Sequence, residues 1–137
     1  MSLFNIFNIS GSAMSAESLR LNTTASNLAN AQSIGSSEAT TYRAKSPVFA
    51  AMMQSLQGDN VSFGVEVKGV VDSTAPLEKR YQPEHPMASE DGYVFLPNVN
   101  VVDEMANMIS ASRAYQSNVE VLNTSKQLMM ATLQLGK

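Results

Sequence analysis

The chain has 137 residues with a formal net charge of −3, and only 15% of its residues are charged. A chain of this length normally forms a single domain, and so small a net charge gives neither nucleic acid nor an anionic membrane an obvious reason to bind. The absence of cysteine excludes disulfide frameworks, thiolate metal sites and cysteine nucleophiles together. Because typical soluble domains carry roughly 25% charged residues, this composition favours a chain that is covered by other protein.

The N-terminal segment predicts a helix from about residue 5 to residue 32, loosened at Gly11. Its apolar and small residues recur in steps close to 3.5, which is the spacing of a coiled-coil seam. The Asn, Ser and Thr residues between them compete for backbone hydrogen bonds, so the helix should be barely stable alone. The residues expected to serve assembly, here called the N-terminal seam, are Met14, Leu21, Ala25, Asn27, Leu28 and Asn30.

The C-terminal segment predicts a longer helix over residues 98–136, where Asn98 or Asn100 can cap the start and Gly136 can close the end. Apolar residues step by 4 and 3 in turn, which favours a helical seam over a strand. Such a helix is about 50 Å long, whereas a domain of this size is only about 30 Å across. The residues expected to serve assembly, here called the C-terminal seam, are Val101, Met105, Met108, Tyr115, Val119, Leu122, Met129 and Leu133.

These segments predict a mainly α protein with a small β element. The two terminal helices are expected to pack as an antiparallel, coiled-coil-like hairpin, so that residues 1–32 and 98–137 form one discontinuous helical domain. Residues 33–97 then form a loop and small β domain between them. Because each seam is narrow, the outer faces need helices from other subunits. Periodicity leaves open an ordinary two-helix core packed on the middle domain.

The middle segment predicts two or three short strands. Alternation of apolar and polar residues predicts a strand over residues 61–71, and a second strand over residues 92–96 follows a turn at residues 90–92. Two long loops are expected at residues 33–46 and 73–91. Residues 42–45 and 47–56 could supply either a strand or a short helix. So few strands make a β element that is marginal by itself.

The chain offers little for catalysis. His85 is the only histidine, so neither a metal site nor a Ser-His-acid triad is expected. Glu90 and Asp91 lie beside Gly92, where adjacent acids form a solvated turn far more often than a catalytic pair. We therefore predict no enzyme, with no catalytic, cofactor-binding or metal-binding residues and no cofactor. Nine methionines suit packing between non-identical chains.

Several stretches together resemble a known family. They are YQPEHPMASEDGYV at residues 81–94, LPNV at 96–99, EMANMISASRAYQSNVEVLN at 104–123 and RLNTTASNLANA at 20–31. This ordered set is similar to the bacterial flagellar rod and hook axial proteins. Many rod proteins continue with TPGY where this chain has QSIGSSEATTYR, and the longer loop before Tyr42 resembles the proximal-rod branch of the family.

The resemblance implies a structural subunit of the proximal rod, the drive shaft that crosses the periplasm and transmits torque from motor to hook. It implies that residues 1–32 and 98–137 form the inner tube of the rod. The implied partners are rod proteins B, F and G, the rod-joining basal-body protein, copies of this chain, and the type III export apparatus during secretion. Neither nucleic acid nor a spanned membrane is among them.

Two further expectations concern location and a rival function. The start, MSLFNIFNIS, lacks a basic n-region and is not expected to be a Sec-type signal peptide, and no stretch approaches the ~18 consecutive apolar residues of a spanning helix. The resemblance implies export without a cleaved signal peptide. The rival function is a free-standing helical adaptor or secretion chaperone that binds a partner helix. Such a protein would be folded and helical alone.

Overall fold

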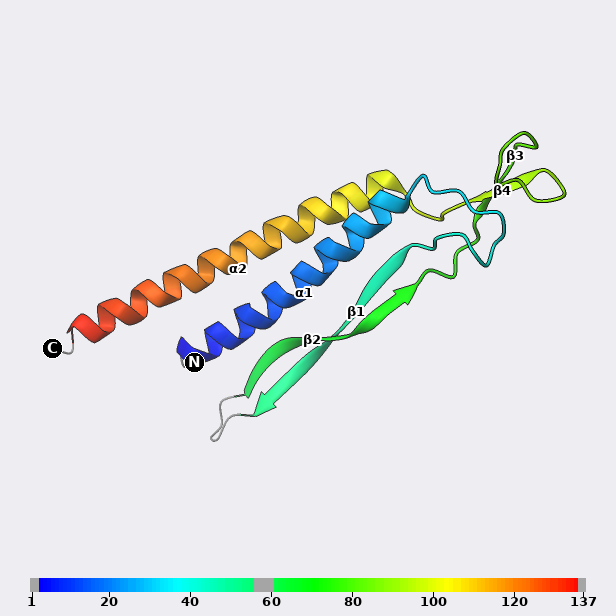
Figure 1. The fold of residues 1–137 in the computed structure, drawn as a ribbon. Coiled ribbons are helices and arrows are strands. Elements are labelled where there is room, and N and C mark those ends of the chain that lie inside the picture. The colour runs from blue at the N-terminus through cyan, green and yellow to red at the C-terminus, as the bar shows by residue number, and fades with distance from the viewer. Residues whose placement is uncertain (1–2, 56–60, 136–137) are drawn as a thin grey trace.

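The fold consists of two long helices with two separate β-hairpins between them in the chain (Figure 1). The computed structural model describes residues 3–55 and 61–135. The elements are α1 (Leu3–Asn30), β1 (Lys45–Ser55), β2 (Val61–Asp72), β3 (Glu78–Tyr81), β4 (Tyr93–Leu96) and α2 (Val101–Leu135). The helices lie side by side and run in opposite directions, β1 and β2 lie along α1, and β3 and β4 lie beyond the end where α2 begins (Figure 1).

Helix α1 is continuous through Gly11, so the loosening predicted there was wrong. A glycine inside a helix costs about 1 kcal/mol relative to alanine, which is tolerable when the helix is held by neighbours. Helix α1 is held on two sides, because it packs against α2 and against the β1–β2 hairpin. Contacts made elsewhere along the helix therefore outweigh the local cost at Gly11.

Helix α2 begins where the sequence predicted, and the choice between the two possible caps is settled. The Asn100 side-chain oxygen accepts a hydrogen bond from the amide of Val102 at 3.0 Å. Asp103 and Glu104 occupy the first turn, where negative charge favours the helix dipole. Asn98 is not the cap, because its side chain bonds to other parts of the chain. The predicted closing residue, Gly136, lies outside the described residues.

The two hairpins contain more strand than the sequence predicted. The predicted strands at 61–71 and 92–96 are present as β2 and β4. Strand β2 pairs antiparallel with β1, which the sequence left open between strand and helix. Strand β4 pairs antiparallel with β3, which the sequence did not reveal. The prediction of an unbroken loop over 73–91 was wrong, since β3 lies inside it. All four residues of β3, EKRY, are exposed. Their sequence has no alternation of apolar and polar residues that could have revealed the strand.

Gly92 sets the turn that joins β3 to β4. It has a positive φ of 78°, and a β-carbon there would lie 2.9 Å from the Tyr81 ring and 3.2 Å from Pro83. We expect Gly92→Ala to destabilise this hairpin by about 1–2 kcal/mol, because strain and a clash act together. Faster amide exchange over residues 93–96 would show it. Gly11→Ala is the control, because no atom would meet the new β-carbon, and it should slow exchange in α1.

The chain has a thin core. Among the described residues the buried apolar side chains are Ala16, Leu77, Val94 and Ala111. Buried polar residues outnumber them: Asn5, Ser10, Thr23, Thr24, Asn27, Thr41 and Ser125. Because the hydrophobic effect scales with the apolar area removed from water, the folded chain alone gains little from it.

Candidate assembly surface

The interface between α1 and α2 is built from small and polar side chains. Ala16 and Ala111 are 5% and 0% exposed, and the Arg20 guanidinium donates a hydrogen bond to the Asn107 side-chain oxygen at 3.2 Å. The helices are antiparallel, so moving one turn along the interface goes back about four residues in α1 and forward about four in α2. One turn from the Arg20–Asn107 pair, Ala16 therefore lies opposite Ala111. Small residues at such a position allow close approach of the two backbones.

The N-terminal seam is divided between inward and outward positions. Met14, Leu21, Leu28 and Asn30 are half-buried, Ala25 is exposed and Asn27 is buried. Asn27 is turned toward the start of β1 and makes its hydrogen bonds within the chain. Asn30 donates to the backbone oxygen of Ser26 in its own helix at 2.8 Å. The two asparagines therefore have partners inside the chain, which the sequence alone did not show.

The C-terminal seam is also divided. Met108, Val119, Leu122 and Met129 are half-buried, whereas Val101, Met105, Tyr115 and Leu133 are exposed. The residues of α2 that are fully buried are Ala111 and Ser125, neither of which belongs to the predicted seam. Large apolar side chains of this seam are thus only partly covered by the chain itself.

Two further apolar surfaces are exposed. Helix α2 extends past the start of α1 (Figure 1), and Leu128, Met130, Leu133 and Leu135 in its last turns are 53–87% exposed. The β1–β2 hairpin carries the second surface, on one face of its two strands. The sequence did not reveal this face, because residues 47–56 contain runs of apolar residues rather than a clean alternation.

The apolar face of the hairpin follows from its register. A β-carbon on Gly64 would meet the Ser12 hydroxyl of α1 at 3.2 Å, so Gly64 faces α1. Alternation places its neighbours Phe63 and Val65 on the opposite face, together with the residues paired to them, Met53 and Ala51. Phe63 and Met53 are 60% and 65% exposed. Side chains of this size in contiguous exposure indicate a surface that meets other protein.

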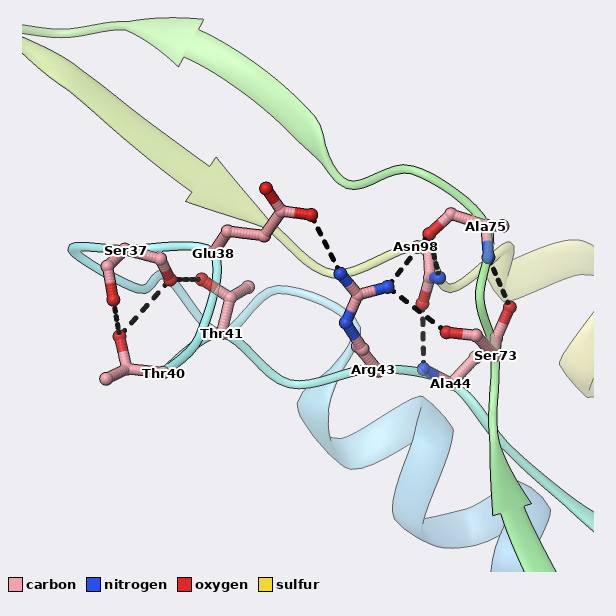
Figure 2. Close-up of polar contacts among 9 residues, drawn as sticks. All are labelled: Ser37, Glu38, Thr40, Thr41, Arg43, Ala44, Ser73, Ala75 and Asn98. Atoms are coloured by element: carbon pink, nitrogen blue, oxygen red, sulfur yellow. Dashed lines mark hydrogen bonds and ion pairs between the residues drawn. The ribbon is translucent and has the colours of Figure 1, made fainter.

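A polar junction connects the base of this hairpin to both helices. Figure 2 shows Arg43 between Glu38 on one side and the backbone oxygens of Ser73 and Ala75 on the other, with hydrogen bonds of 2.9, 3.2 and 3.1 Å. The next residues, Ala44 and Lys45, bond to asparagines from opposite ends of the chain. The junction therefore joins segments that are far apart in sequence.

The Lys45 side chain adds an ion pair at this junction. Its amine donates to an Asp72 carboxylate oxygen at 2.9 Å, and this bond raises the pKa of Lys45 above its ordinary value of 10.5. Because the pKa of Lys45 is raised, the ion pair contributes fully to folding stability below pH 10.5, and this contribution is lost as the pH rises through the raised pKa. Both side chains are largely exposed, so the pair adds little to stability.

Two features predicted to play no part in catalysis can be placed in the described residues. Among residues 3–55 and 61–135, no three His, Cys, Asp or Glu side chains gather as a metal site would need. The His85 ring nitrogen Nδ1 accepts a hydrogen bond from the amide of Met87 at 3.1 Å, within its own loop. Within the same ranges, no helix is both long and apolar enough to cross a membrane.

Comparison with known proteins gives matches at both ends of the chain and over its full length. Residues 7–32 match the family described as flagella basal body rod protein, and residues 90–135 match the flagellar basal body rod FlgEFG protein C-terminal family. The flagellar basal-body rod protein FlgC of Yersinia enterocolitica is 53% identical over 137 residues, and that of Salmonella typhimurium is 50% identical. The Escherichia coli O157:H7 protein of the same name is 51% identical. All three matches cover 100% of both chains.

These matches confirm the resemblance to the rod proteins and its proximal-rod branch. The match over residues 7–32 takes in most of α1, and the match over residues 90–135 takes in β4 and α2. The chain belongs to the flagellar basal-body rod protein FlgC family and is a structural subunit of the proximal rod, not an enzyme.

Proposed function

We propose that this subunit polymerises with rod proteins B, F and G, the rod-joining basal-body protein and copies of itself into the part of the rod that crosses the periplasm. Torque then passes from motor to hook through packed helices. The observation that carries the proposal is the imbalance between a thin core and large exposed apolar surfaces on α2 and the β1–β2 hairpin. Monomers rarely leave so much apolar surface uncovered.

In this arrangement residues 1–32 and 98–137 form the inner tube, packed as a coiled-coil-like antiparallel hairpin. The half-buried residues of both seams, such as Leu21 and Leu122, become fully covered by helices of neighbouring subunits. Residues 33–97 contact neighbours further from the axis. The buried alanines and the antiparallel direction of the helices support this division.

Folding of the termini is completed on incorporation. Ordering a residue costs about 1–2 kcal/mol of backbone entropy, and the apolar burial available within one chain is small. The export apparatus therefore receives a chain with loosely held termini. The same weakness suppresses polymerisation before export, because a partner end is needed to complete the helices.

Amide hydrogen exchange tests this proposal on the purified, dilute chain and on isolated basal bodies. We expect the terminal helices to be weakly protected in the purified chain and strongly protected in basal bodies. Strong protection of residues 98–135 in the dilute chain would contradict folding on incorporation and would favour the helical adaptor. Absence of the chain from basal bodies would contradict the rod assignment itself.

A further inference from the structure

The β1–β2 hairpin packs along α1 and leaves its outer face exposed. Its large apolar side chains are between 36% exposed, at Val65, and 65% exposed, at Met53. Away from the base, a hydrogen bond joins hairpin and helix, in which the amide of Val65 donates to the Ser12 hydroxyl at 3.1 Å. Much of the apolar surface of the hairpin is therefore not buried against α1, and the hydrogen bonds at its base add directional contacts to that packing.

Asn27 supplies the first of these contacts from helix α1. Its side-chain oxygen accepts from the amide of Lys45, and its side-chain nitrogen donates to the carbonyl of Lys45, both at 2.8 Å. The same oxygen accepts from the Tyr42 hydroxyl at 2.9 Å. Only 1% of Asn27 is exposed, so these bonds are shielded from water. The amide thus pairs with the first residue of β1 much as a neighbouring strand would.

Asn98 supplies a second contact from the segment that leads into α2. Its side-chain oxygen accepts from the amide of Ala44 at 2.8 Å, and its nitrogen donates to the carbonyl of Ala75 at 2.9 Å (Figure 2). Ala44 precedes β1 and Ala75 follows β2, so one side chain holds both ends of the hairpin. The carbonyl of Ala44 also accepts from the amide of Ser73 at 2.7 Å, which closes the base.

We infer that Asn27 and Asn98 are positioning residues that set the direction of the β1–β2 hairpin relative to the helix pair. Because one asparagine belongs to the N-terminal helix and the other precedes the C-terminal helix, the base of the hairpin is bonded to both terminal segments. Hairpin direction is thereby coupled to helix pairing. This inference deepens the proposed function, and the role of the hairpin in the rod rests on that function. In the rod, only a subunit whose helices are paired would present the apolar face of its hairpin to a neighbour.

A cross-link across the hairpin measures its direction. The chain contains no cysteine, and a β-carbon on Gly64 would lie 3.7 Å from that of Ser12, within the range for a disulfide. The parent for the test is therefore the full chain carrying Ser12→Cys and Gly64→Cys. Its rate of oxidation to the intramolecular disulfide is followed by gel mobility in the purified chain and in isolated basal bodies. Ser12→Cys also removes the Ser12–Val65 hydrogen bond, which leaves the packing on α1 and the hydrogen bonds at the base to hold the hairpin.

We expect Asn98→Ala, and separately Asn27→Ala, to slow disulfide formation about fivefold or more, since each removes at least two hydrogen bonds. The matched control is Asn118→Ala, because the Asn118 side chain donates to the backbone oxygen of Ala114 within its own helix and lies outside both seams, and its rate should equal that of the parent. Asn98 is half-buried and lies outside both helices, so the Asn98→Ala variant tests the inference if Asn27→Ala fails to fold. Circular dichroism checks that helix content is kept.

Each outcome bears on the inference. Slower cross-linking with unchanged helix content supports it. Rates equal to the parent in both asparagine variants overturn it, because the hairpin would then be held by packing alone. A parent that forms no disulfide in either preparation also overturns it, since the hairpin would not lie along α1. If the asparagine variants slow cross-linking as expected but the parent chain never enters basal bodies, the positioning role is upheld and the rod assignment is contradicted.

Discussion

Leu122→Asp is expected to stop rod completion and swimming while synthesis and export continue. Leu122 is half-buried on α2 in the isolated chain and belongs to the C-terminal seam, which we propose is covered on assembly. The change removes up to about 3 kcal/mol of leucine burial and places an unpaired charge where other helices pack. Immunoblots of cell fractions and isolated basal bodies, together with swimming in soft agar, measure the three steps separately.

The control for this variant is Asn123→Asp, which adds the same charge at the next residue. Asn123 is exposed and outside the seam, so swimming should be close to normal. Normal swimming of the Leu122→Asp strain would contradict the seam assignment. Loss of swimming in both strains would show that α2 rejects any added negative charge, and burial of Leu122 would then not be the cause.

Ala111→Leu is expected to have a comparably large effect, for a different reason. Ala111 is fully buried, and the antiparallel direction of the helices places it opposite Ala16, which is also buried. The larger leucine side chain has no space there, and overpacking of a buried site costs about 1–3 kcal/mol. In a chain with so few buried apolar residues, this is enough to separate α1 from α2. Faster amide exchange in both helices within basal bodies, or loss of incorporation, would show it.

Ala106→Leu serves as the comparison on the same helix, because Ala106 is exposed. Leucine has nearly the helix propensity of alanine, so this variant should keep α2 intact and still enter the rod. If Ala111→Leu were incorporated as well as Ala106→Leu, the close approach of the helices would not be needed for function. The proposed packing of the helix pair would then have to be revised.

The sequence was informative wherever periodicity and local signals acted along one segment. The 3.5-residue steps identified both helices, an asparagine was expected to cap the second of them, and alternation identified β2 and β4. The stretches at residues 81–94 and 104–123 carry the resemblance to the family, and the full-length relatives confirm it. These features depend on neighbouring residues, which a single sequence displays directly.

Local signals failed where partners lie far apart in the chain. Strand β1 could not be decided from the sequence because its apolar run fits either a strand or a helix, and pairing with β2 decided for the strand. Strand β3 is four exposed residues held by β4. Gly11 stays helical because α1 is packed on two sides. In each case contacts with distant segments supplied free energy that local propensity does not record.

The sequence by itself therefore determined the two long helices and the membership of the rod family. Only the tertiary structure decided what the asparagines do. Asn27 was predicted to serve assembly, and Asn98 was one of two candidate caps; in the structure both bond to the base of the β1–β2 hairpin. A side-chain amide can bond to any backbone within reach, and which backbone comes within reach is decided by the packing of the whole chain.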